Sequence, residues 1–151
     1  MTWRDVLVRY NKESSENALA LRSAYQLYAN YTYQALVAKF GMGKIYILSA
    51  GWGLIAASFM TPHYDVTFAA NAESWKRRKK NEPYSDFSML PTDPEEQLLF
   101  LGGKDYVPLF SQLTKLVRPT RMVFYNSACP TRSAGLPACE IRDKHSHQLA
   151  L

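Results

Sequence analysis

The sequence predicts an α/β fold in which a small, mostly parallel sheet is flanked by helices. Three short apolar segments, residues 44–48, 98–101 and 121–125, have the composition of buried strands. Segments with a helical spacing of apolar residues lie between them, and strands that alternate with helices form parallel sheets with right-handed crossovers. The turns after the three strands should therefore open on one carboxyl edge, where open α/β sheets bind ligands.

The first half of the chain is expected to hold a long helix, the first strand and a second helix. Residues 15–40 contain no proline or glycine and repeat apolar residues at helical spacing, and Gly41-Met42-Gly43 should end this helix. Residues 71–80 indicate the second helix, with Glu73 in its first turn and five cations in its last. Residues 3–10 have only a weak strand pattern.

The second half begins with a helix-start signature. Asp93 and Glu96 stand at the two positions of a capping box, and residues 98–101 then favour a short strand. A further helix should begin at Asp105 and run to about Leu116, with Pro108 tolerated in its first turn.

Length and composition indicate one domain, residues 1–140, followed by an irregular tail at 141–151. The longest apolar run, around residues 45–55, is far short of the roughly 20 residues that cross a bilayer, so no membrane span is expected. Two cysteines and a first segment without secretory layout indicate the reducing cytoplasm. The net charge of +5 permits a phosphate-bearing partner without requiring one.

The glycine-rich bend after the first strand is one candidate site. In Ser49-Ala50-Gly51-Trp52-Gly53 the glycines Gly51 and Gly53 would let backbone amides approach a ligand. No glycine precedes Ser49 by two residues, so the bend is not a nucleophile elbow and no serine-hydrolase triad is predicted. Ser49 is expected to hydrogen-bond within the bend or to shape its backbone.

The segment after Pro62 is expected to be extended. Asp65 could accept a hydrogen bond from a ribose or a base on which Tyr64 stacks. Alternatively, Tyr64 belongs to the core and Asp65 caps a turn. His63 is assigned no role.

The turn Gly102-Gly103-Lys104-Asp105 joins the second strand to a helix start. Free amides, the helix dipole and the Lys104 ammonium could converge there on an anion. The alternative is a plain tight turn capped by Asp105. The spacing of a Walker A loop is absent.

The strongest electrostatic feature is a run of five cations: Lys76, Arg77, Arg78, Lys79 and Lys80. Either the run is a solvated helix end stabilised by the helix dipole, or it contacts a phosphate backbone, which would be sequence-independent and strongly salt-dependent. Arg132, in the loop after the third strand, is a candidate phosphate ligand.

Two cysteines and two histidines near the end of the chain are enough in number for zinc, but they lack Cys-x-x-Cys spacing. They are Cys129, Cys139, His145 and His147. We predict neither a metal site nor a cofactor.

Two of these motifs resemble the YaaA-type peroxide-stress proteins and the related short bacterial and phage domains of unassigned function. In that superfamily a strand leads into Leu-Ser-Ala/Gly, then Gly-Leu, then Pro-Tyr, and residues 45–64 are similar to this core. Residues 100–109 resemble the Gly-Lys-Asp-Tyr turn of the short members. The resemblance covers about half of the chain.

The resemblance implies a pocket beside the Pro-Tyr segment, which favours a functional role for Tyr64 and Asp65. It implies DNA binding and protection from oxidative damage for the stress proteins, and a base- or nucleotide-processing role for the short ones. The resembling proteins usually begin with another strand and a Cys/Ser-x-x-Lys turn, which residues 3–10 do not supply. We therefore expect a truncated or divergent member.

These observations predict a nucleic-acid- or nucleotide-associated protein with a phosphate- or base-binding pocket at the carboxyl edge of the sheet. Two alternatives remain: a small-molecule enzyme, such as a nucleotide or glycosyl hydrolase, that uses Asp65 or Asp105 as acid or base, and a non-catalytic interaction protein with a vestigial pocket. The predicted ligand-binding residues are Ser49, Gly51, Gly53, Tyr64, Asp65, Gly103, Lys104, Asp105, Tyr106 and Arg132, with residues 76–80 as the predicted nucleic-acid-binding segment.

Overall fold

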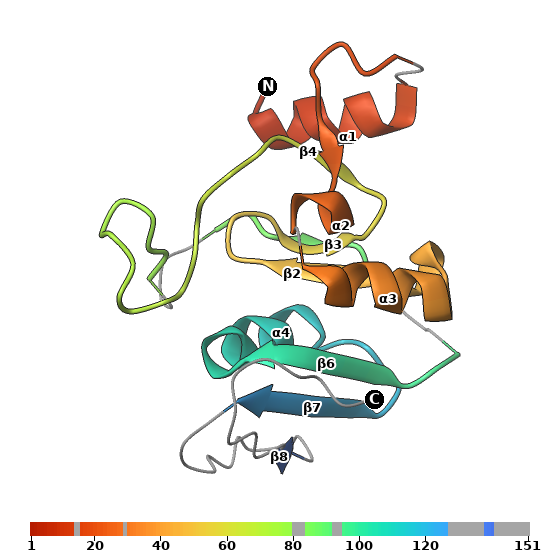
Figure 1. The fold of residues 1–151 in the computed structure, drawn as a ribbon, viewed down its shortest axis with the longest axis vertical. Coiled ribbons are helices and arrows are strands. Elements are labelled where there is room, and N and C mark those ends of the chain that lie inside the picture. Colours follow the sequence, from red (N-terminus) through yellow and green to blue (C-terminus); the bar gives the residue numbers. More distant parts are fainter. Residues whose placement is uncertain (14–15, 29, 80–83, 92–94, 127–137, 141–151) are drawn as a thin grey trace.

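The computed structural model describes residues 1–13, 16–28, 30–79, 84–91, 95–126 and 138–140. The chain is a mixed α/β protein, as predicted (Figure 1). Helix α1 lies at one end of the long axis and strand β7 near the other, with the hairpin of β2 and β3 between them. Among the described residues no helix is long and apolar enough to cross a membrane.

Helix α1 spans Trp3–Glu13, where the sequence showed only a weak strand pattern. The cause is a capping box: the Thr2 amide donates to the Asp5 carboxylate at 2.7 Å, and the Asp5 amide donates to the Thr2 hydroxyl at 3.3 Å. Hydrogen bonds from the amide and hydroxyl of Thr2 lower the pKa of Asp5. The Thr-x-x-Asp spacing was the sequence signal for this helix.

The predicted helix at 15–40 is wrong in its first half. Residues Arg22–Ser23 form strand β1, which pairs antiparallel with strand β4, Met60–Thr61. A short helix α2, Ala24–Leu27, follows, and helix α3 covers only Tyr31–Phe40. The Asn30 side chain accepts from the Thr32 amide and begins α3, and Gly41 ends it at φ 81° as predicted.

The first predicted strand is confirmed as β2, Tyr46–Ser49, which follows the 3-10 turn η1, Met42–Lys44. It turns back at once through strand β3, Gly53–Ala56, in an antiparallel hairpin. Strand β5, Phe87–Ser88, then pairs parallel to β3. The bend after β2 is therefore a hairpin turn and not the strand-to-helix turn that a parallel sheet requires.

The predicted helix at 71–80 is also wrong. Residues 68–79 contain no regular helix, because the backbone pairs with a neighbouring segment instead of with itself. The Thr67 amide donates to the Lys76 carbonyl and the Arg78 amide donates to the Thr67 carbonyl, each at 2.9 Å. This pairing turns Arg78 toward the interior.

The second and third predicted strands are confirmed as β6, Leu98–Gly103, and β7, Arg121–Asn126. They pair in parallel, and β8, Ala138–Glu140, pairs in parallel with β7. The connection between β6 and β7 contains the 3-10 turn η2, Lys104–Tyr106, and helix α4, Val107–Leu113. This helix ends before Leu116; its N-cap residue is Tyr106 and not Asp105, and the Tyr106 side chain makes no capping hydrogen bond.

The predicted single, mostly parallel sheet is divided. Strand β2 pairs within the sheet β2-β3-β5, whereas β6 and β7 belong to the parallel sheet β6-β7-β8. Helix α4 covers the second sheet by packing Val107 and Phe110 on Phe100, Val123 and Tyr125. A cluster of Ala50, Phe68 and Leu109 joins the hairpin turn to α4.

Candidate functional site

The hairpin turn after β2 is organised by Ser49. Its side chain is 1% exposed, and its hydroxyl oxygen accepts from the amides of Gly51 at 3.1 Å and Trp52 at 3.0 Å. Ser49 thus shapes the turn by hydrogen bonding, as the sequence favoured, and does not display a nucleophile. Gly53 holds φ 86°, and a Cβ there would lie 2.5 Å from the Phe87 carbonyl oxygen.

Tyr64 packs on this turn. A Cβ at Gly51 would lie 3.1 Å from the Tyr64 ring, so glycine lets the ring approach the backbone. The Tyr64 hydroxyl hydrogen-bonds to that of Tyr28. Burial raises the pKa of Tyr64, although hydrogen bonding acts in the opposite direction.

Tyr64 belongs to a cluster of phenols from different parts of the chain. Burial raises the pKa of Tyr28, with further contributions from Tyr64, and burial also raises the pKa of Tyr33. The Tyr106 phenol is near enough that its ionisation would raise the pKa of all three further. We call Tyr28, Tyr33, Tyr64 and Tyr106 the phenol cluster.

Tyr106 places the second predicted turn, residues 102–105, beside the hairpin turn. Its ring contacts Phe68 edge-on at 5.0 Å between centroids and packs on the cluster that contains Ala50 of the hairpin turn. Gly103 and Lys104, which precede it, are exposed. Gly103 has an extended backbone with φ −74°, and the atom nearest to an added Cβ would be Tyr106 Cδ2 at 3.8 Å, an ordinary contact.

Other predicted site residues lie apart from this cluster. Asp65 is on the surface, where its carboxylate pairs with the Lys76 ammonium at 2.7 Å. Asp105 lines a small hollow together with Arg78, Phe68 and Leu109. The prediction for Arg132 lies outside the described residues, as do the predictions for Lys80, Cys129, the Cys139 side chain, His145 and His147.

The run of cations does not form one surface. Lys76 pairs with Asp65 and Glu73, and these two hydrogen bonds raise the pKa of Lys76. Arg77 donates to the Ala70 carbonyl at 3.2 Å, and Lys79 is exposed.

Arg78 is 6% exposed, so it has no open face for a phosphate backbone. Its two terminal nitrogens donate to the two carboxylate oxygens of Asp86, each at 2.7 Å, and one of them also donates to the Ala50 carbonyl at 3.0 Å. The guanidinium lies 4.0 Å from the Tyr84 ring centroid. Arg78 therefore supports the hairpin turn from within.

Sequence reasoning missed the residues that surround the turn. Arg4 of α1 donates to the Gly51 carbonyl at 3.2 Å, and its guanidinium lies 5.3 Å from the Trp52 ring and 4.9 Å from the Phe87 ring. Tyr28 and Tyr33 come from the tyrosine-rich region predicted as one helix. The richness in tyrosine was a signal, but the break between α2 and α3 that brings the two rings within 5.3 Å was not visible.

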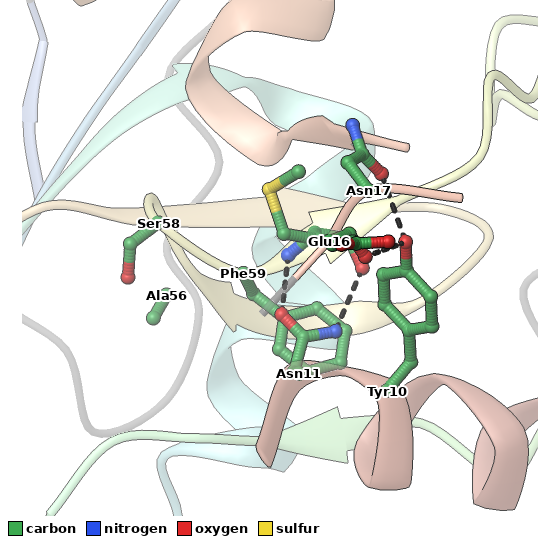
Figure 2. Close-up of a pocket in the computed structure, with 8 residues that line it drawn as sticks. Tyr10, Asn11, Glu16, Asn17, Ala56, Ser58 and Phe59 are labelled. Carbon is green, nitrogen blue, oxygen red and sulfur yellow. Dashed lines mark hydrogen bonds between the residues drawn. The ribbon is translucent and has the colours of Figure 1, made fainter. Parts of the chain in front are cut away.

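Another hollow, of about 470 Å³, lies elsewhere (Figure 2). None of the predicted site residues lines it; its walls are Tyr10, Asn11, Glu16, Asn17, Ala56, Ser58, Phe59 and Met60. Asn11 joins α1 to β4 by bonding both the amide and the carbonyl of Met60, and the Tyr10 hydroxyl bonds Asn17. Since the side chains of Tyr10, Asn11 and Asn17 already hydrogen-bond to neighbouring segments, we interpret the hollow as a packing gap between α1 and the segments that it contacts.

Within the described ranges, no group of three or more His, Cys, Asp or Glu side chains could hold a metal ion. Comparison of the chain with protein-family models, with curated proteins and with solved structures finds no significant match.

Proposed function

We propose that this chain is a nucleotide- or nucleic-acid-associated protein of the YaaA-like kind. Its ligand binds between the hairpin turn at residues 49–53 and the turn at residues 103–106. The supporting observation is that the two predicted glycine turns meet: Tyr64 packs on Gly51 of the hairpin turn, and Tyr106 packs on the cluster that contains Ala50 of the same turn. A role in DNA damage, in the oxidative-stress response or in nucleic-acid modification, in the cytoplasm, remains part of the proposal.

The chemistry of the two turns suits the two ends of a nucleotide. Phenol hydroxyls and the edges of aromatic rings suit a base, because they offer hydrogen bonds and apolar contact together. Gly103 and Lys104 suit a phosphate: the ammonium is exposed, and the fold does not itself require glycine at position 103.

This proposal is tested by titrating the protein with the four ribonucleoside monophosphates in a calorimeter. Lys104→Ala should weaken binding by about 1.5–3 kcal/mol, because it removes a charge-assisted contact. Lys115→Ala, a change of the same type at an exposed position beyond α4, should leave binding unchanged. No binding by the unaltered protein, or equal losses in the two variants, would contradict the proposal.

Gly103→Val gives a second, steric test. The variant should fold, since a Cβ at this position meets only an ordinary contact, but it should lose nucleotide binding because its side chain blocks approach to the backbone. Gly43→Val is the matched control, as no atom lies within 4 Å of a Cβ there. A Gly103→Val variant that binds normally would remove this turn from the site.

A nucleic-acid partner makes a different prediction for the exposed cations. Reversal of Arg77 and Lys79 to glutamate should weaken binding of single-stranded DNA equally for unrelated sequences and should flatten its salt dependence, because fewer counterions are released. Titrations at several salt concentrations measure both effects. If the salt dependence of binding is unchanged in the variant, these cations do not contact a nucleic acid, and mononucleotides remain the proposed ligand class.

A further inference from the structure

The phenol pair of Tyr28 and Tyr64, beside Ser49, has one proton more than its own hydrogen bond uses. The two hydroxyls are joined by one hydrogen bond. Two hydroxyls supply two protons, and one hydrogen bond uses one of them. One O–H group is therefore left to donate elsewhere.

Ser49 cannot accept this proton. A serine hydroxyl has two acceptor lone pairs, and the amides of Gly51 and Trp52 occupy both. The remaining donor therefore belongs to the phenol pair of Tyr28 and Tyr64. Within the described residues no other hydrogen bond involves either phenol oxygen.

A second donor in the same aromatic cluster also lacks an acceptor. The Trp52 indole nitrogen is buried without a hydrogen-bond partner among the described residues. The Trp52 ring meets Tyr64 edge-on at 6.1 Å between centroids and stacks on Phe87. A buried donor without an acceptor is costly, so the Trp52 indole nitrogen beside the phenol pair requires an explanation.

We propose that the phenol pair of Tyr28 and Tyr64 donates a hydrogen bond to an acceptor atom of a nucleobase, a ring carbonyl oxygen or ring nitrogen, bound against the hairpin turn. The inference rests on the proposed function and adds that this end of the site recognises the base of the nucleotide. Burial supports it by raising the pKa of both phenols, which keeps both protons in place at neutral pH. The site therefore selects for acceptors at the base edge.

The test removes the donors without removing the rings. The double variant Tyr28→Phe/Tyr64→Phe should bind the four nucleoside monophosphates and the corresponding nucleosides about tenfold more weakly, the loss expected for one neutral hydrogen bond. Its affinity for ribose 5-phosphate, which has no base, should be unchanged. Tyr31→Phe is the control, because this tyrosine on α3 is 79% exposed and lies outside the cluster.

Each single variant keeps one phenol with a proton to donate, so each should lose less affinity than the double variant. A double variant that binds nucleosides normally would overturn this inference while the proposed function stands. An equal loss for ribose 5-phosphate would also overturn it, since the phenols would then act on the structure as a whole. If the unaltered protein binds neither nucleosides nor nucleotides, both proposals fall.

Discussion

Arg78 is an interior residue although it stands in a run of five cations. Its charge is balanced by the bidentate pair with Asp86, in which both side chains are 4% exposed. By contrast, the pair between Lys44 and Glu96 is on the surface, with side chains 59% and 69% exposed. Two ion pairs of the same kind should therefore differ greatly in what their removal costs.

Asp86→Ala should lower the free energy of unfolding by about 3–5 kcal/mol, because it leaves the buried Arg78 charge without its carboxylate partner. Glu96→Ala should lower it by less than about 1 kcal/mol, since an exposed pair is screened by water. Urea unfolding of both variants measures the difference. Similar losses would show that Asp86 does not hold the interior charge.

Gly53 is required by the backbone, and Gly43 is not. Gly53→Ala should destabilise by at least about 1–3 kcal/mol from the positive φ alone, and the contact with the Phe87 carbonyl oxygen adds to this cost. Gly43→Ala should change stability little, because its added Cβ meets no atom within 4 Å. Thermal melts compare the two variants. A Gly53→Ala variant as stable as the unaltered protein would contradict the positive φ of Gly53 in the turn.

At the scale of elements, α1 is held against β4 and the hairpin turn by polar contacts, and its Leu7 is fully buried. Asn11 is the main polar link: its amide group donates to the Met60 carbonyl at 3.0 Å, and its carbonyl oxygen accepts from the Met60 amide at 2.7 Å. These bonds mimic a strand partner for β4. Arg4, on the same helix, reaches the hairpin turn.

Asn11→Ala should therefore destabilise by about 1–3 kcal/mol, because the Met60 amide loses its acceptor in a partly buried place. Lys12→Ala, at the neighbouring exposed position, should have little effect. Hydrogen exchange of the Met60 amide gives a local readout. Unchanged exchange in Asn11→Ala would mean that α1 does not protect β4.

At the scale of the whole molecule, the phenol cluster links segments from α2 to η2. Burial raises the pKa of Tyr28, Tyr33 and Tyr64 in the folded state. In the unfolded chain tyrosine ionises near pH 10. Above that pH the unfolded state loses these protons while the folded state keeps them, so the stability that the cluster contributes is lost as pH rises.

Unfolding experiments between pH 8 and about 11 should show this decline. Tyr28→Phe should make the decline shallower, because one raised pKa is removed, whereas Tyr31→Phe at its exposed position should not. Identical pH profiles for all three proteins would contradict the burial of the Tyr28 hydroxyl.

The sequence by itself determined the elements whose signals are local. Strands β2, β6 and β7 follow from short apolar runs, the end of α3 from Gly41, and the parallel pairing of β6 with β7 from the helix between them. It also predicted the turn-shaping role of Ser49.

Only the tertiary structure decided the remaining features, because each depends on a partner distant in sequence. The pairing of β1 with β4 broke the long helix, and the pairing of Thr67 with Lys76 and Arg78 replaced the predicted helix at 71–80. The burial of Arg78 depends on Asp86. The phenol cluster likewise requires a hydrogen bond between Tyr28 and Tyr64, which are 36 residues apart. No local sequence pattern predicts a contact over that separation.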